Sequence, residues 1–174
     1  MLDLSSIESD LNDVALLSLV HQSNVFGTIN PVLKIIEHAK SKGVLTLIDG
    51  AQAVPHFPVD IATLDCDFYV FSGHKIVGPT GVGVLIGRKS ILDKMDPFLG
   101  GGEMINNVTM EKSTWNEIPW KFEAGTPNIA QVIGLGSAID YIEDIGLKNI
   151  QIHEDGLLKY CIEELSKIDD MILY

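Results

Sequence analysis

The feature that most constrains the fold of this sequence is a series of short apolar segments separated by turns and helical patterns. These segments are Val14–Val20 (VALLSLV), Val44–Asp49 (VLTLID), Asp67–Phe71 (DFYVF) and Gly81–Gly87 (GVGVLIG). Apolar residues at nearly every position are typical of strands that are covered on both faces. Strands of this kind in alternation with helices predict an α/β fold with a largely parallel sheet. The short link that leads into the last segment leaves an antiparallel orientation open for that strand.

A helical pattern with clear ends lies between the first two apolar segments. Its apolar stripe consists of Val32, Ile35, Ile36 and Ala39. We expect Asn30 to be the N-cap and Pro31 to take the first helical position, because these residue types favour those places. We expect Gly43 to end the helix, since glycine readily adopts the left-handed conformation found at helix ends.

The second half of the chain is less regular. Lys89–Met95 predicts a short helix, and apolar stripes predict two longer helices around residues 129–142 and 157–168. Between them, Phe98–Pro127 shows few clear periods, so we expect an irregular stretch that is functional or poorly ordered. The glycines at 100–102 in that stretch, and His56 before it, are interpreted as structural.

Length and composition bound the class of protein. The chain has 174 residues, of which 46% are hydrophobic, enough for a single domain with a core. The net charge of −12 argues against a nucleic-acid backbone or an anionic membrane as a partner. No apolar run approaches the roughly 20 residues that span a bilayer, and the acidic start MLDLSSIESD lacks the apolar core of a signal peptide. We therefore expect a cytoplasmic protein.

The cysteine and histidine residues predict neither a disulfide framework nor a metal site. Cys66 lies between two aspartates, whose charges raise the pKa of a thiol, and Cys161 lies on a helical apolar stripe. Both cysteines are interpreted as structural, and Cys161 is expected in the core. The histidines are scattered and show no HxxxH or HExxH spacing, so no metal is expected.

Polar residues follow each of the first three predicted strands, at the edge where an open α/β sheet binds ligands. They are Asn24 after the first strand, Asp49 and Gln52 at the end of the second, and Ser72, His74 and Lys75 after the third. Taken alone, the aspartate is equally well explained as a helix cap, and the lysine as a solvated surface group. Together they put an acid and a lysine on one rim of one sheet.

This combination favours pyridoxal 5'-phosphate (PLP) as cofactor. PLP needs a lysine for its Schiff base and an acid that keeps its pyridinium nitrogen protonated, which are the roles assigned to Lys75 and Asp49. The lysine must lose a proton to act as nucleophile or base, and a desolvated site lowers its pKa. The remaining assignments are the phosphate for Ser72 and His74, and the phenolic oxygen of the ring for Gln52 or Asn24.

A nucleotide-binding domain is the weaker alternative. Gly81 with Gly83, and Gly134 with Gly136, each form a GxG pattern. Neither matches GxGxxG placed after a strand and before a helix, because the first pair opens a strand and the second lies within a helix.

A family resemblance rests on segments that extend over nearly the whole chain from Ser23 onward. They are SNVFGTINPV, LIDGAQAVPHFPVD, LDCDFYVFSGHKIVGPTGVGVLIG, GGGEMI and FEAGTPNIAQVIGLGSAIDYI. DGAQ and SGHK are typical of the class V aminotransferase-like PLP enzymes of fold type I, and FEAGTPN points to the branch with desulfurases and selenocysteine lyases. The chain as a whole resembles the SufS-type cysteine desulfurases.

The resemblance implies a fold, an activity and site residues. The fold would be a three-layer α/β/α domain, part of the major domain of an aspartate aminotransferase-like PLP-transferase. Lys75 would carry PLP and move the substrate Cα proton, and Thr126 would reach the phosphate of the neighbouring subunit in a homodimer. The family converts L-cysteine to L-alanine and leaves a persulfide on an enzyme cysteine, which supplies iron–sulfur cluster assembly through a sulfur acceptor.

The resemblance also implies what these residues lack. Subunits of the family are much longer, with a ring-stacking histidine upstream, and a persulfide-forming cysteine and a carboxylate-binding arginine in a downstream domain. The one arginine here, Arg88, follows a predicted strand and is expected at the surface. We therefore expect residues 1–174 to be a single domain, the central part of the PLP-binding large domain, that is inactive by itself. The alternatives left open are a selenocysteine lyase, another class V aminotransferase, or a non-catalytic PLP-binding or dimerisation module.

Overall fold

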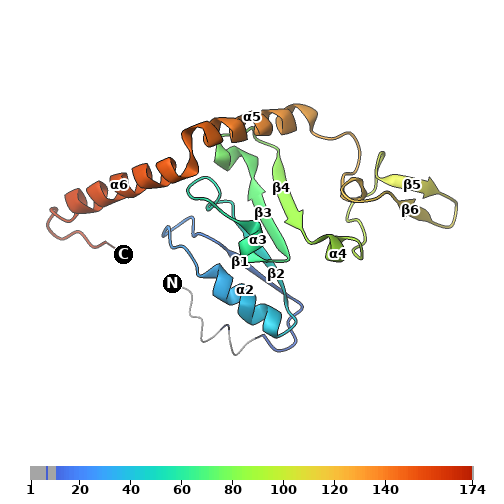
Figure 1. Cartoon of the computed structure of the whole chain (residues 1–174), viewed down its shortest axis with the longest axis horizontal. Helices are drawn as coiled ribbons and strands as arrows, with labels where there is room; N and C mark the ends of the chain where they lie inside the picture. Colours follow the sequence, from blue (N-terminus) through green and yellow to red (C-terminus); the bar gives the residue numbers. More distant parts are fainter. Residues whose placement is uncertain (1–6, 8–10, 174) are drawn as a thin grey trace.

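A four-stranded sheet forms the centre of the fold (Figure 1). The computed structural model describes Ile7 and residues 11–173, so most of the acidic start lies outside the described residues. The strands follow one another in the order β1 (Leu16–Val20), β2 (Leu45–Asp49), β3 (Phe68–Ser72) and β4 (Gly83–Gly87). β1, β2 and β3 are parallel, and β4 is antiparallel to β3. This confirms the predicted α/β class with a mostly parallel sheet.

Helices connect and flank these strands. They are α2 (Val32–Ser41), α3 (Ile61–Leu64), α4 (Lys89–Leu92), α5 (Ile129–Ile145) and α6 (Leu147–Leu165), with short 3-10 helices η1 (Gly73–Ile76) and η2 (Trp120–Phe122). Figure 1 shows α5 running across the end of the sheet where β3 leads into η1, and α6 continuing away from it. As expected, Gly43 follows α2 in the left-handed conformation, with φ of +73°.

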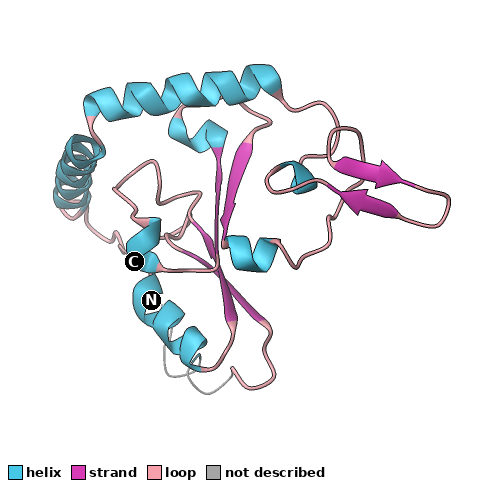
Figure 2. Cartoon of the chain, turned by 45° about the vertical axis from the view of Figure 1, so that its right-hand side comes forward, coloured by secondary structure: helices cyan, strands magenta, loops and turns pink. Residues whose placement is uncertain are grey.

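The core lies on one face of the sheet, beneath α2 and α3 (Figure 2). Ile36 of α2 packs against Ile48 of β2 and Tyr69 of β3, and none of the three side chains is more than 1% exposed. Burial of one such aliphatic side chain contributes about 1.5–3 kcal/mol, so this layer supplies much of the fold's stability. The apolar stripe predicted for the helix therefore faces the sheet.

The opposite face of the sheet, here called the open face, is largely exposed. Alternate residues of a strand share a face, and the strand register puts Asp49 and Ser72 on the open face together with exposed apolar residues. These apolar residues are Leu16, Val20, Leu45 and Leu85, which are 46%, 42%, 36% and 56% exposed. Within the described residues, the helices thus cover one face of the sheet far better than the other.

The predicted N-cap of α2 is wrong. The helix begins at Val32, and Asn30 makes no cap hydrogen bond. Instead the side-chain amide of Asn30 donates to the carbonyl of Val20 at 2.8 Å, and the residue is only 6% exposed. Asn30 fixes the loop after β1 rather than the start of the helix, because a buried amide needs a partner that the strand end offers.

The stretch predicted to be irregular contains a hairpin. β5 (Ile105–Val108) pairs antiparallel with β6 (Ser113–Trp115), and η2 follows before α5. The hairpin stands away from the main sheet in Figure 1. Its strands bury little, since five of their seven residues are exposed, so the sequence shows no strong apolar alternation there.

The expectation for Cys161 is also wrong. Cys161 is exposed, and α6 has no buried residue. The Nε of Arg88 donates to Asp67 at 3.0 Å, and its Nη2 donates to the carbonyl of Asp65 at 2.6 Å. Arg88 thus lies at the surface, with its side chain 36% exposed, and takes part in an ion-pair network with Asp65 and Asp67. Cys66 is 6% exposed, which agrees with a structural role.

Candidate cofactor site at the carboxyl edge of the sheet

Asp49 ends the strand that lies between β1 and β3, and its position is fixed from several sides. Its carbonyl accepts the N–H of His21 at 2.8 Å, and its Oδ1 accepts the N–H of Ala51 at 2.9 Å. The next N–H, that of Gly50, donates to the carbonyl of Val70 on β3 at 2.8 Å. These bonds hold the turn and its carboxylate between the two neighbouring strands.

Lys75 lies in η1, directly after β3. The turn around it is tight, because the N–H of Gly73 bonds to the Val82 carbonyl at 2.9 Å and that of Gly78 to the Gly73 carbonyl at 3.0 Å. A Cβ at Gly78 would lie 2.8 Å from that same carbonyl oxygen, so only glycine fits. Lys75 is half-buried, and within the described residues no carboxylate lies at ion-pair distance from it.

The residues around the lysine leave room at this edge. Ser72 pairs with Gly83 in the strand register, and the absence of a side chain at Gly83 keeps the space beside the Ser72 hydroxyl open. A Cβ at Gly83 would also make a tight contact, 3.1 Å from the carbonyl oxygen of Phe71. His74, in the η1 turn, is exposed.

The structure brings together all but one of the residues singled out in the sequence. Gln52 follows Asp49 in the same turn and is half-buried, and Asn24 is exposed in the loop after β1. That loop is closed by the N–H of Ser23, which bonds to the Thr28 carbonyl at 2.9 Å. These residues share the carboxyl edge of the parallel strands with Asp49, Ser72, His74 and Lys75.

Thr126 is the residue that the structure leaves apart. It is exposed and precedes α5, where it lines a cavity of about 440 Å³ with Glu103, Trp120 and Val132. None of the residues that line this cavity belongs to the group around Asp49 and Lys75.

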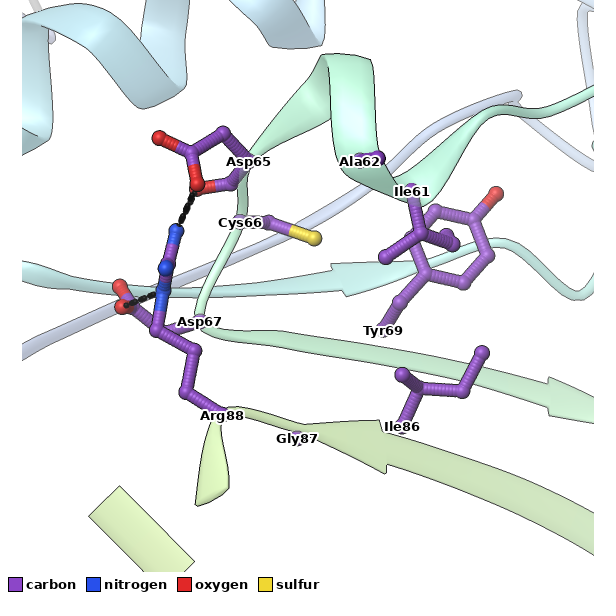
Figure 3. A pocket seen from close by; sticks show the side chains of 9 residues that line it. All are labelled: Ile61, Ala62, Asp65, Cys66, Asp67, Tyr69, Ile86, Gly87 and Arg88. Carbon is purple, nitrogen blue, oxygen red and sulfur yellow. Dashed lines mark hydrogen bonds and ion pairs between the residues drawn. The ribbon is translucent and has the colours of Figure 1, made fainter. Parts of the chain in front are cut away.

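A second cavity, of about 190 Å³, lies near the opposite edge of the sheet and is not a good cofactor site (Figure 3). Figure 3 shows Arg88 directed at Asp65 and Asp67, so the charges that line this cavity pair with one another. These contacts hold the pKa of Asp65 low, because Lys40 and Arg88 both donate to it. Burial raises the pKa of the Cys66 thiol, which makes it a poor nucleophile.

Sequence reasoning missed His21 at the candidate site. The residue directly follows β1 and is only 7% exposed, and its Nδ1 lies 3.0 Å from the Tyr69 hydroxyl. Burial lowers the pKa of His21, so its ring is neutral at neutral pH. The sequence signal for His21 was a histidine directly after a predicted strand, at the edge where the other site residues lie. Its partner Tyr69 is 48 positions away, so no local pattern links the two.

The groups at the carboxyl edge fit PLP chemically. A carboxylate held by main-chain bonds suits a pyridinium nitrogen, and a primary amine with no acidic partner suits an aldehyde. Open α/β sheets bind their ligands at this edge. Within the described residues, no cluster of metal-ligating side chains offers an alternative use of the site. The sheet and its donor set together suit a PLP-binding domain.

Comparison with known proteins identifies the family. The family model described as "Aminotransferase class-V" matches residues 1–174, and the chain belongs to this family. It is 49% identical to a cysteine desulfurase of Haloferax volcanii over 174 residues, which cover 99% of this chain and 41% of that protein. It is 51% identical to a cysteine desulfurase of Shigella sonnei over 160 residues, 91% of this chain and 39% of that protein.

Solved structures agree with this identification. The apo cysteine desulfurase from Thermococcus onnurineus matches with a TM-score of 0.91 and 41% identity, over 95% of this chain and 42% of that chain. A cysteine desulfurase from Escherichia coli matches with a TM-score of 0.75 and 46% identity, over 77% of this chain and 34% of that chain. The resemblance to cysteine desulfurases is thus confirmed, and PLP is the cofactor of this family.

The chain spans about two fifths of the length of the relatives it matches. Among the residues that the structure describes, none of the helices has the length and apolar character needed to cross a bilayer.

Proposed function

We propose that the chain is the PLP-binding core of a cysteine desulfurase of the SufS type. The observation that carries this proposal is the placement of Asp49, Ser72 and Lys75 at one edge of the sheet, with Asp49 and Ser72 on the same open face. PLP, when bound, supplies the electron sink that stabilises negative charge at the substrate Cα.

Asp49 and Lys75 would then have different roles toward the bound cofactor. Asp49, whose turn is held by main-chain bonds, orients the ring and keeps the ring nitrogen protonated. Lys75 holds the cofactor covalently through its Nζ and moves the proton at the substrate Cα. Within the described residues no carboxylate pairs with the Lys75 amine, which leaves it free to react with the cofactor aldehyde.

The remaining residues would hold the rest of the cofactor. Ser72 and His74 bind its phosphate as hydrogen-bond donors, and Gln52 and Asn24 contact the phenolic oxygen. Thr126 stands apart from these groups, which supports a role across a homodimer, where it would reach the phosphate of the partner subunit.

For the full reaction we propose conversion of L-cysteine to L-alanine, with the sulfur passed to an enzyme cysteine and then to an acceptor protein for iron–sulfur cluster assembly. Cys66 does not suit that persulfide role, because it is buried and its pKa is raised. Both cysteines are free, which agrees with a reducing cytoplasm. We therefore expect these residues to bind PLP and to lack turnover by themselves.

Covalent trapping tests the cofactor site directly. The purified protein is incubated with PLP, reduced with borohydride and mapped by mass spectrometry, and the expected result is one modified peptide that carries the label on Lys75. Lys75→Ala should lose the label. Lys89→Ala should keep it, because Lys89 pairs with Asp93 on the surface of α4. Labelling of several surface lysines, or none at Lys75, would contradict the assignment.

The substrate alternatives need a separate assay. With the full-length gene product, we expect alanine and reducible sulfide from L-cysteine. A much higher kcat/KM for selenocysteine than for cysteine would instead identify a selenocysteine lyase. Amino transfer to a keto acid without release of sulfur would indicate another class V aminotransferase.

A further inference from the structure

A buried histidine joins the Asp49 turn to the opposite face of the sheet. The main-chain N–H of His21 donates to the Asp49 carbonyl at 2.8 Å, and its ring Nδ1 lies 3.0 Å from the Tyr69 hydroxyl. The ring also packs edge-on against Phe57, with centroids 5.3 Å apart. His21 is 7% exposed, so solvent does not compete for these contacts.

Tyr69 closes this arrangement beneath the turn. Its side chain is fully buried, and it lies on the face of the sheet opposite to the Asp49 carboxylate. A Cβ added to Gly50 would lie 2.1 Å from the Tyr69 hydroxyl oxygen and ring edge, so the ring fills the space directly under the turn. Asp49, His21 and Tyr69 are therefore connected in a closed loop of contacts.

The pair is uncharged at neutral pH, which suits it to this place. Burial lowers the pKa of His21, and burial together with the nearby Cys66 and Asp49 raises the pKa of Tyr69. A neutral imidazole and a neutral phenol share one hydrogen bond here, in which either Nδ1 or the Tyr69 hydroxyl can be the donor. A neutral support adds no charge next to the Asp49 carboxylate.

We propose that His21 and Tyr69 are positioning residues, which set the height and angle of the Asp49 carboxylate at the cofactor site by fixing the Asp49–Gly50 turn from below. This proposal rests on the proposed role of Asp49 toward PLP. Position matters there because a displacement of about 1 Å at a reacting group can cost on the order of 100-fold in rate.

The test measures the PLP dissociation constant of variants by absorbance titration, alongside kcat and KM of the full-length protein. His21→Leu removes the ring nitrogen, and Tyr69→Phe removes the hydroxyl while keeping the ring beneath Gly50. Each should weaken PLP binding about tenfold, equivalent to about 1.4 kcal/mol. We expect kcat to fall further than KM changes, because the carboxylate acts mainly in the transition state.

A conservative variant and a matched control separate positioning from folding. In His21→Asn the side-chain amide, which has both an acceptor oxygen and a donor nitrogen, can take the place of Nδ1, so PLP affinity should recover to within about threefold of the original protein. Thr46→Val removes a buried hydroxyl bond at the other end of β2. It should lower stability without changing PLP affinity. If His21→Leu does not fold, Tyr69→Phe and His21→Asn still decide the question.

A double-mutant cycle with Asp49 gives the sharpest outcome. If His21 and Tyr69 act through Asp49, removing the Tyr69 hydroxyl should have little further effect on PLP affinity in a protein that already carries Asp49→Asn. Full additivity of the two losses, or unchanged PLP affinity in Tyr69→Phe, would overturn the positioning role. An Asp49→Asn variant that binds PLP normally, with no label on Lys75, would instead refute the proposed function itself.

Discussion

Thr46 and Asp67 show how a single polar pair is kept inside this sheet. Thr46 is fully buried, and both its N–H and its hydroxyl donate to Asp67 Oδ2, at 2.8 and 3.1 Å. The N–H of Asp67 donates back to the Thr46 hydroxyl at 3.1 Å, and Arg88 donates to the other carboxylate oxygen. Each buried polar atom of the pair has a partner, which is what makes its burial tolerable.

This pairing predicts the stability of a Thr46→Val variant. The change keeps the shape of the side chain but removes two hydrogen bonds, so it should lower the free energy of unfolding by about 1–3 kcal/mol. Urea unfolding followed by circular dichroism measures the loss. Thr80→Val, at an exposed turn position, is the control and should change stability by less than about 0.5 kcal/mol. Equal midpoints for the two variants would contradict the role of the pair.

His21 predicts a dependence of stability on pH. Because burial lowers its folded-state pKa below the ordinary value of 6.5, the unfolded chain binds a proton first as the pH falls. The contribution of His21 is therefore complete above pH 6.5 and is lost as the pH falls toward the lowered pKa.

The measurement compares unfolding midpoints at pH 7.5 and at pH 5.5. His21→Asn should show a smaller decrease between these conditions than the original protein, since asparagine does not titrate. His153→Asn, on the exposed surface of α6, should retain the original decrease. The idea fails if both variants behave alike.

At the scale of elements, the contact between α5 and the η1 turn determines how the lysine is held. Leu135 of α5 lies 3.0 Å from where a Cβ would stand at Gly78, and 3.3 Å from one at Gly73. Two further glycines lie within α5 itself. Gly134 faces Pro79 so closely that a Cβ would lie 2.7 Å from the proline ring, whereas a Cβ at Gly136 meets nothing within 4 Å. Gly134 therefore allows α5 to pack closely against Pro79, whereas no neighbouring atom requires a glycine at position 136.

These two glycines predict opposite effects of the same substitution. Gly136→Ala should raise the free energy of unfolding by about 0.5–1 kcal/mol, because alanine favours the helix and the space is open. Gly134→Ala should lower it by about 1–3 kcal/mol, since the new methyl group pushes α5 away from Pro79. Denaturant unfolding of both variants measures the difference, and a gain in both would show that α5 does not pack on the turn as described.

At the scale of the whole molecule, the main feature is a set of apolar side chains exposed to solvent on the open face and on α5. The open face carries Leu16 and Leu85, which are 46% and 56% exposed, and α5 presents Ile129 and Ile133 at 58% and 67%. Large exposed apolar patches are uncommon on monomers and are typical of interfaces.

The chain alone should therefore self-associate and bind the dye ANS. Leu85→Lys, on the open face of the edge strand β4, should reduce both effects, as measured by sedimentation velocity and dye fluorescence. Asn12→Lys adds the same charge at an exposed polar position and should leave both unchanged. If the two variants reduce association equally, net charge rather than the open face is responsible.

The sequence by itself determined the four strands of the main sheet, their order along the chain and the residues at their carboxyl ends, because continuous apolar runs and the turn residues between them are local patterns. Asp49 and Lys75 could be singled out for the same reason, since each follows a strand directly. Only the tertiary structure decided which face is covered, that Cys161 is exposed, and that Arg88 pairs with Asp67. The bond between His21 and Tyr69 joins residues 48 positions apart. A contact of that kind depends on how the strands are brought together in the sheet, and no local pattern encodes it.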